Sequence, residues 1–439
     1  MHKLVFLLLL LVLVSSCARR LDLGLDHNAF KNIMNVTIHG QSGMNGPCEP
    51  SICISPNDPN LVVAGSITNN VYTSTDGGQS WTKDKMKSQY GVYGDPVVRI
   101  NSTGEVFYAH LSNPSGKAYK SEDFLDRIVV QKSSDHGKTW STGTYPAVNH
   151  KTDHDKPWFA INPSGKIILM TWTEFDKYDS KDPKDKSRIL FSKSEDAGLS
   201  WSDAIMISEL EGDCLDDDKT TEGAIPAFDE KGNFYVVWSF NGKIYLDKST
   251  DGGKTWLKRD KVIADQPGGW TFSIAGISRC NGLPMMKIDG SEGTGKGNMY
   301  VQWTDQRNGK DDTDVWFIKS TDNGETWSPV KRVNDDIKGR QQFLSWMDVD
   351  VKTGYIYIVF YDRRNHEDSN TDVYLAYSVD QGKTFINTKI SETPFKPNSG
   401  VFFGDYNDIS AYGGRVRPIW TRLDEHGLSV MTALIDVGK

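Results

Sequence analysis

The sequence lacks three features that would point to common functional classes. Its 50 Lys and Arg residues are outnumbered by 58 Asp and Glu residues, and the net charge of −8 comes without a basic stripe for nucleic acid. Its five cysteines include no Cys-x-x-Cys pair, which disfavours a zinc site. Beyond residue 14, no apolar run is long enough to cross a bilayer. We therefore expect neither a nucleic-acid partner nor an integral membrane protein.

The first residues have the pattern of an export signal. Lys3 precedes an apolar run over residues 4–14, which is too short for a membrane span and is followed by Ser15-Ser16-Cys17. This ending resembles a bacterial lipobox, which implies cleavage before Cys17 and lipidation of its thiol. We predict a lipoprotein signal peptide over residues 1–16, a tether over 17–31 and a lipid-anchored protein of the cell envelope. A soluble secreted protein is the alternative.

The remaining cysteines are Cys48, Cys53, Cys214 and Cys280. An exported protein lies in a compartment where disulfides form, and four cysteines allow three pairings. Cys214 and Cys280 both lie shortly before a predicted inner strand, so these two could meet.

An eight-residue phrase organises the rest of the chain. The pattern S-x-D-x-G-x-[ST]-[WF] begins at Ser74 and occurs six times, with aspartates 59, 61, 55, 71 and 58 residues apart. Glycine supplies the positive φ of a turn, Asp and Ser or Thr bond its amides, and the closing aromatic packs beside the next strand. Spacing of this kind predicts a repeat architecture of hairpin corners, with the phrase residues themselves structural.

A second repeat marks the strand that opens each unit. Seven openings can be aligned, beginning at Glu49, Asp95, Asp155, Glu222, Asn281, Phe343 and Asp405. The seventh unit has three candidate strands, and residues 34–39 alternate like a strand that could complete it and close the ring. We predict an all-β fold, one β-propeller domain over residues 32–439 with four-stranded antiparallel blades. Seven blades are favoured and six are the alternative.

The phrase is the Asp-box, and the chain resembles the sialidase superfamily of β-propellers. The segment around Glu222 resembles the one that carries the glutamate activating the nucleophile, and Asp405-Tyr406-Asn407 resembles the one that carries the nucleophilic tyrosine. The resemblance implies that Tyr406 attacks the anomeric carbon while Glu222 takes its proton. Where the family has its first carboxylate-gripping arginine, this sequence has Cys48-Glu49-Pro50, so sialic acid specificity is not implied.

Propeller geometry places the strand openings together around the central channel. Asp95 or Asp155 would serve there as acid/base, since clustered carboxyls shift one another's pKa. The predicted substrate-binding residues are Glu49, Arg279, Arg363, Trp270 and Asp405. Each of these carboxylates has a simpler reading as a strand cap or ion pair. Arg363 belongs to a loop built twice, Asp305-Gln-Arg-Asn and Asp362-Arg-Arg-Asn, whose repetition favours a structural ion pair.

Three functional classes remain open on the sequence. The preferred one is an exported, sialidase-like glycoside hydrolase acting on a glycan or polysaccharide. The alternatives are a glycan-binding surface lipoprotein without catalysis and a propeller platform for protein partners. No cofactor is expected; the acidic loop over residues 213–218 could take calcium, although it lacks a calcium-loop spacing and a solvated loop is preferred.

Overall fold

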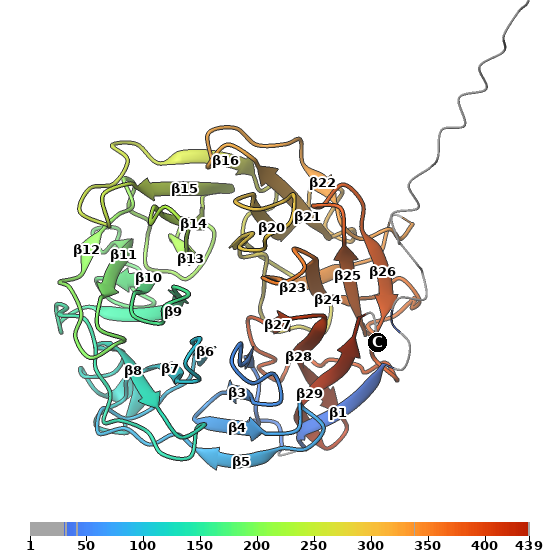
Figure 1. Cartoon of the computed structure of the whole chain (residues 1–439), viewed down its shortest axis with the longest axis horizontal. Coiled ribbons are helices and arrows are strands. Elements are labelled where there is room, and N and C mark those ends of the chain that lie inside the picture. Colours follow the sequence, from blue (N-terminus) through green and yellow to red (C-terminus); the bar gives the residue numbers. More distant parts are fainter. Residues whose placement is uncertain (1–29, 31–32, 41–42, 338, 438–439) are drawn as a thin grey trace, which may run out of the picture.

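A computed structural model of the chain describes residues 30, 33–40, 43–337 and 339–437. The predicted signal peptide, most of the tether and the lipidation site Cys17 lie outside these residues. Figure 1 shows a ring of blades around a central axis. There are seven blades among the described residues, as the strand openings predict. Within the same residues the structure holds no α-helix, and so none that could cross a membrane.

The first four blades follow the chain in order, and the first strand of each lies nearest the axis. Blade 1 contains β2 (Ser51–Ile54), β3 (Val62–Ser66), β4 (Asn70–Ser74) and β5 (Thr82–Lys85). Blade 2 contains β6 (Val97–Ile100), β7 (Val106–Leu111) and β8 (Ile128–Ser133). Blade 3 contains β9 (Asp153–Ile161), β10 (Ile168–Phe175), β11 (Ser187–Ser194) and β12 (Ile205–Met206). Blade 4 contains β13 (Glu222–Phe228), β14 (Phe234–Phe240), β15 (Lys243–Ser249) and β16 (Lys261–Asp265).

The last three blades complete the ring. Blade 5 contains β19 (Met285–Ile288), β20 (Met299–Asp305), β21 (Asp314–Ser320) and β22 (Lys331–Arg332). Blade 6 contains β23 (Gln342–Val349), β24 (Ile356–Asp362), β25 (Asp372–Ser378) and β26 (Ile386–Lys389). Blade 7 contains β27 (Asp408–Tyr412), β28 (Arg415–Asp424), β29 (Gly427–Asp436) and the N-terminal β1 (Met34–His39). The predicted closure is confirmed, because the N-terminal β1 pairs antiparallel with the C-terminal β29 and supplies the outer strand of this blade (Figure 1).

Blade 2 and the connection between blades 4 and 5 depart from the four-stranded plan. Blade 2 has three strands, and an isolated bridge between Val130 and Thr144 takes the place of its outer strand. The loop between β7 and β8 contains a 3₁₀ turn, η1 (Ala118–Lys120). The connection between blades 4 and 5 holds a ribbon of β17 (Thr271–Phe272) and β18 (Cys280–Asn281). These long connections lie beside the openings of inner strands, where they can shape a site.

Large aromatic side chains fill the space between blades. Trp172, Trp238, Trp303 and Trp420 each lie on the second strand of a blade and are at most 1% exposed. A fully buried aromatic side chain contributes about 1.5–3 kcal/mol relative to an exposed one. Side chains along each strand point alternately to the two faces of its blade. Because neighbouring blades cover both faces, both are apolar. The packing between blades therefore holds the inner strands in fixed positions around the channel.

The Asp-box turns are built as the sequence predicts. In the fifth box the Ser320 hydroxyl accepts from the Gly324 amide at 2.9 Å and donates to Asp322 at 2.7 Å. Asp322 also accepts from the Thr326 amide at 2.9 Å, and hydrogen bonds led by the Thr326 hydroxyl lower its pKa to about 2. In the other boxes the Gly amide likewise donates to the Ser hydroxyl, at 2.8–2.9 Å. These residues form a structural corner.

The disulfide expectation is wrong for the described residues. Cys48, Cys53, Cys214 and Cys280 are all free thiols. Cys280 belongs to β18, which pairs with β17, whereas Cys214 forms an isolated bridge with Ser180 in blade 3. Both cysteines come before inner strands along the chain, but they are held by different partners in space.

Candidate active site at the channel mouth

The openings of the inner strands lie on the face opposite the Asp-boxes. In blade 1, Ser51 at the start of the inner strand pairs with Gly65 at the end of the second strand. Val62, at the start of that second strand, pairs with Ser74, which begins the box. Each strand reverses direction, so the strand openings and the boxes end up at opposite ends of the blade. We call the open end of the channel at the strand openings the channel mouth.

A cavity of about 540 Å³ lies at the channel mouth, within the size range of small-ligand sites. Four residues predicted from the sequence line it: Glu49, Asp95, Asp155 and Arg279. Residues that the sequence did not single out complete the lining. They are chiefly Lys156 and the aromatic side chains Tyr93, Tyr119, Tyr178 and Phe402.

Three carboxyl groups form a row at the base of the cavity. Glu49, Asp95 and Asp155 come from the openings of blades 1, 2 and 3, and each is at most 6% exposed. The Asp95 carboxyl is hydrogen-bonded to the carboxyls of both neighbours, so Asp95 is the middle member of the row. Burial, and then the charge of Glu49, raises the pKa of Asp95 to about 7. Burial also raises the pKa of Glu49 and of Asp155, so the row holds protons at neutral pH. We call these three residues the carboxyl row.

The backbone at the carboxyl row is held in an uncommon conformation. Glu49, Asp95 and Lys156 have φ values of 51°, 46° and 47°, in the left-handed region that few non-glycine residues adopt. Each of them precedes a proline, which itself favours an extended backbone at the preceding residue. Strain of this kind costs about 1–3 kcal/mol per residue and gathers at functional sites. The blades therefore impose an arrangement that the local sequence would not adopt alone.

Asp405 anchors the two cations of the cavity. Lys156 Nζ lies 2.9 Å from Asp405 Oδ2, and Arg279 Nε donates to Asp405 Oδ1 at 2.8 Å. Arg279 also pairs with Asp216, which accepts from the Tyr178 hydroxyl at 2.7 Å. Burial disfavours the Asp405 charge, but Arg279 and Lys156 outweigh it and hold the pKa of that carboxyl well below its usual value. Asp405 is thus ionised and fully engaged, so it positions the cations rather than contacting a ligand.

Tyr406 and Glu222 are buried, outside the cavity lining. The Tyr406 ring contacts Trp158 edge-on, with centroids 5.2 Å apart, and Trp158 contacts Trp346 at 4.6 Å. Burial raises the pKa of Tyr406, and the carboxyls that raise it further are Asp95 and Glu49. Glu222 instead accepts from the Thr173 hydroxyl at 2.8 Å.

An aromatic cluster of Tyr406, Trp158 and Trp346 stands beneath the carboxyl row. Trp158 also borders a second cavity, of about 920 Å³, toward the Asp-box end of the inner strands. The charges of Asp95 and Glu49 act on Tyr406, which packs against Trp158. The cluster therefore connects the neighbourhood of the carboxyl row with the wall of the second cavity.

Two predicted binding residues lie elsewhere. Trp270 is 2% exposed, and its indole N–H donates to the Thr220 carbonyl at 3.2 Å, so neither ring face is open for stacking. Arg363 is 4% exposed and donates to Gln341 Oε1 and to the Ala275 carbonyl, both at 2.7 Å. Trp270 and Arg363 thus hold the long connection between blades 4 and 5 against its neighbours.

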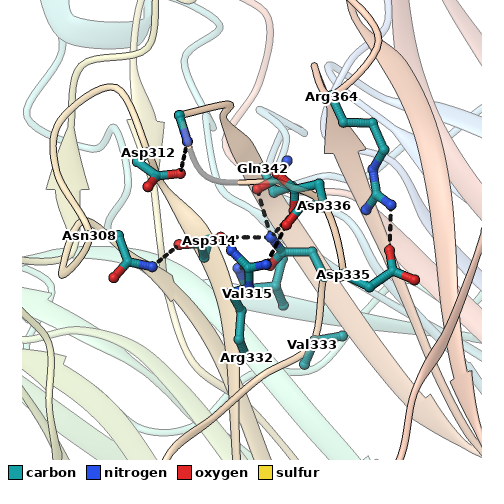
Figure 2. A network of polar contacts seen from close by, with 12 residues as sticks. Asn308, Asp312, Asp314, Val315, Arg332, Val333, Asp335, Asp336, Gln342 and Arg364 are labelled. Carbon is teal, nitrogen blue, oxygen red and sulfur yellow. Dashed lines mark hydrogen bonds and ion pairs between the residues drawn. The ribbon is translucent and has the colours of Figure 1, made fainter.

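The loop built twice in blades 5 and 6 is structural. Arg307 pairs with Asp305, and Arg364 pairs with Asp362, as its repetition predicts. Figure 2 shows the surrounding network, in which Arg364 also reaches Asp335 at 2.5 Å. The side-chain amide of Asn334 bridges Asp314, Asp336 and Gln342 at 2.6–2.8 Å. These contacts tie blade 5 to blade 6 (Figure 2).

The acidic loop over residues 213–218 contributes to the site without forming a metal centre. Its Asp216 pairs with Arg279 at the cavity, and Asp218 accepts from the Thr271 amide at 2.9 Å. In the described part of the chain, no group of three or more His, Cys, Asp or Glu side chains has an arrangement that could hold a metal ion.

Comparisons with known proteins agree with this fold. Residues 72–83 and 318–329 match the BNR/Asp-box repeat. A protein of unknown function from Dyadobacter fermentans is similar over 93% of this chain and 100% of its own, with a TM-score of 0.51 and 13% identity. An ulvan lyase, described as a new polysaccharide lyase family, is similar over 92% and 96%, with a TM-score of 0.53 and 10% identity.

A third similar structure is the NanB sialidase from Streptococcus pneumoniae, with a TM-score of 0.48 and 10% identity over 92% of this chain and 95% of that one. No curated protein matches the chain in sequence. The repeats and the seven blades define the class of the protein, an Asp-box β-propeller. The similarity to the Dyadobacter protein and to the ulvan lyase, at 13% and 10% identity, is one of fold.

Proposed function

We propose that the protein is a glycoside hydrolase that removes a sugar from the end of a glycan bound at the channel mouth. The observation that carries this proposal is the carboxyl row, Glu49, Asp95 and Asp155, at the base of a cavity. Glycoside hydrolysis uses two carboxyl groups, one that donates a proton and one that acts as base or nucleophile. The row contains carboxyls that hold protons at neutral pH and can also release them.

The two ends of the row suit these two roles. Asp155 keeps its proton because it is buried and lies beside Asp95, which makes it the candidate general acid. Glu49, at the other end, is the candidate base or nucleophile, with Lys156 and Arg279 favouring its ionised form. Asp95 couples the two, since ionisation of one carboxyl raises the pKa of the next.

The walls of the cavity suit the end of a glycan. Tyr119 and Phe402 are 67% and 42% exposed at the cavity, so their rings are free to stack on a sugar. An acidic sugar is disfavoured, because its carboxylate would face the carboxyl row while both cations are already paired.

Tyr406 has a different neighbourhood from the one that the resemblance implies. Among the described residues its buried hydroxyl has no hydrogen-bond partner, and the carboxyls whose charges act on it most are Asp95 and Glu49. If Tyr406 attacks the substrate, these carboxyls rather than Glu222 are positioned to take its proton. Comparing Tyr406→Phe with Glu222→Gln tests this, because loss of turnover in the first alone supports the new pairing.

One observation favours the alternative, a protein that binds a glycan without cleaving it. Neighbouring carboxyls in the row are in direct hydrogen-bond contact. Catalytic pairs in glycoside hydrolases stand about 5–9 Å apart. Only the outer members, Glu49 and Asp155, can then meet this requirement.

The deciding experiment measures sugar release from a panel of glycans and aryl glycosides by the wild type, Asp155→Asn and Glu49→Gln. We expect both variants to lose about 10²- to 10⁴-fold in rate. Asp247→Asn is the matched control, because Asp247 is a buried carboxyl in blade 4 whose pKa burial raises to about 7. Turnover that survives in both row variants would refute the proposal, and binding without turnover in the wild type would support the alternative.

We further propose that the protein is exported and lipid-anchored through Cys17. Support comes from the sequence alone, the apolar run over residues 4–14 followed by Ser15-Ser16-Cys17. Mass spectrometry of the mature protein should find acylated Cys17 at its N-terminus. A mature chain that begins elsewhere and partitions with the soluble fraction would contradict this.

A further inference from the structure

Acidic side chains outnumber basic ones in the lining of the cavity. Its lining contains two cations, Lys156 and Arg279, and both are already neutralised by carboxylates outside the lining. Lys156 pairs with Asp405 at 2.9 Å, while Arg279 pairs with Asp405 and Asp216. Both cations of the lining are therefore already engaged with other carboxylates, and neither is free to neutralise the three members of the carboxyl row.

Two members of the carboxyl row, Glu49 and Asp95, have no ion-pair partner in the part of the chain that the structure describes. Among the described residues, the ion pairs at the cavity involve Asp155, Asp216 and Asp405 but neither Glu49 nor Asp95. The Asp155 contact is the longest of them, 3.9 Å from Lys156 Nζ. A buried carboxylate without a counterion is costly, and a ligand that supplies the missing positive charge recovers that cost.

Asp95 also has an acceptor that the chain leaves unfilled. Asp95 is 6% exposed and lines the cavity, and no N–H or hydroxyl group in the described residues donates to its Oδ2. Glu49 Oε1, by contrast, accepts from the Asp405 amide at 3.1 Å. Because Asp95 Oδ2 is itself buried, a positively charged donor in the cavity would stabilise the Asp95 carboxylate through its charge.

We propose that the cavity binds a sugar that carries a protonated amino group, with Glu49 and Asp95 as its counterions. The proposal rests on the proposed function in one respect, that the ligand of the cavity is a glycan. An ammonium group has three N–H donors and no acceptor, which suits a site with several carboxylate oxygens. It is also small enough to reach the base of the cavity while its sugar ring stays at the rim.

The rim favours a sugar over a bare metal ion. Tyr93, Tyr119 and Tyr178 lie on one side of the cavity with ring centroids 6.2–6.4 Å apart, and Phe402 also lines it. Aromatic faces stack on sugar rings and attract cations, whereas hard metal ions prefer oxygen ligands throughout. The cavity, at about 540 Å³, is also far larger than an ion requires. The raised pKa of Asp95 fits the same interpretation, because burial without a cation disfavours its charge.

The test measures binding of three monosaccharides by calorimetry at about pH 7, where both an amine and the row can carry charge. Glucosamine, glucose and N-acetylglucosamine share a ring and differ in the amino group. We expect glucosamine to bind about tenfold or more tightly than the other two, as a charge-assisted hydrogen bond allows. Glu49→Gln and Asp95→Asn should abolish this preference, and Asp247→Asn should keep it.

Three results would overturn the proposal. Equal affinity for the three sugars would show that the row does not recognise an amine. Equal binding of a lysine amide would show that the ligand is not a sugar, and calcium that binds in competition with glucosamine would assign the row to a metal.

The outcome is separable from that of the hydrolase proposal. Amino-sugar binding without sugar release would refute the hydrolase and keep this inference. Turnover of neutral glycosides without an amine preference would do the reverse.

Discussion

The Asp-box turns and the channel mouth both place carboxyl groups at the ends of propeller strands, yet they surround them differently. In a box, Asp322 is partly exposed to solvent and accepts from the Thr326 amide and hydroxyl and from Ser320. At the mouth, Asp95 is buried, and its carboxyl contacts mainly other carboxyls. The pKa is accordingly lowered to about 2 in one place and raised to about 7 in the other.

This difference distinguishes the carboxylates that stabilise the fold from the carboxyls that can take part in proton transfer. A box carboxylate stays ionised at any physiological pH and has all its bonds within one turn, so it serves the hairpin. A carboxyl of the row holds a proton that it can transfer near neutral pH, at a cost to the folded state. Six boxes repeat one solution, whereas the row exists once and needs three blades to assemble it.

The largest expected effect comes from removing a cation at the mouth. Arg279→Met should lower the free energy of unfolding by about 3 kcal/mol, because it leaves the buried charge of Asp405 with Lys156 alone. Equilibrium denaturation measures this loss. Arg340→Met is the control, since Arg340 only approaches the exposed Glu367 at 3.8 Å and should change stability by less than about 1 kcal/mol. Similar values for both variants would mean that the ion network at the mouth is not specially stabilising.

The next effect depends on pH. The pKa of Asp95 is raised from 3.8 to about 7, so between these values the unfolded chain ionises while the folded protein keeps its proton. The contribution of Asp95 to wild-type stability should therefore fall across this window as pH rises, and level off above it. Asp95→Asn removes this dependence, so the variant should gain up to about 4 kcal/mol over the wild type near pH 8 and almost nothing below pH 4.

Denaturation of both proteins at about pH 4, 6 and 8 checks this window. The exposed Asp84 provides the control, because Asp84→Asn should follow the wild-type curve at every pH. Parallel curves for wild type and Asp95→Asn would show that Asp95 has an ordinary pKa.

The smallest effect belongs to a box. Ser320→Ala removes the acceptor of the Gly324 amide and one donor to Asp322, so it should cost about 1 kcal/mol. The rate of sugar release should stay at the wild-type value, since the box lies at the far end of its blade. A stable variant with altered turnover would break the separation between the two faces.

The sequence was sufficient to predict the fold because its signals are local. A box is complete within eight residues, and seven aligned openings predict seven blades with β1 closing the ring. The carboxyl row could also be anticipated, because Glu49, Asp95 and Asp155 occupy matching positions in three repeats.

The pairings at the site could not be predicted in the same way. Arg279 and Asp405 are 126 residues apart, and no spacing relates them. Lys156 follows Asp155 directly and looks like an ordinary solvated residue until the left-handed backbone turns it toward Asp405. Trp270 is of a residue type that can stack on sugar rings, but tertiary packing buries it. The aromatic rim carries no motif, since its members come from four separate connections.

The central claim is that a carboxyl at the channel mouth holds its proton near neutral pH. Carbon-13 NMR of protein labelled at the aspartate carboxyls titrates these groups directly and needs no substrate. We expect a resonance with a midpoint near pH 7 that disappears in Asp95→Asn and persists in Asp247→Asn. If the resonance lost in Asp95→Asn instead titrates below about pH 5, like an ordinary aspartate, the account of the site is contradicted.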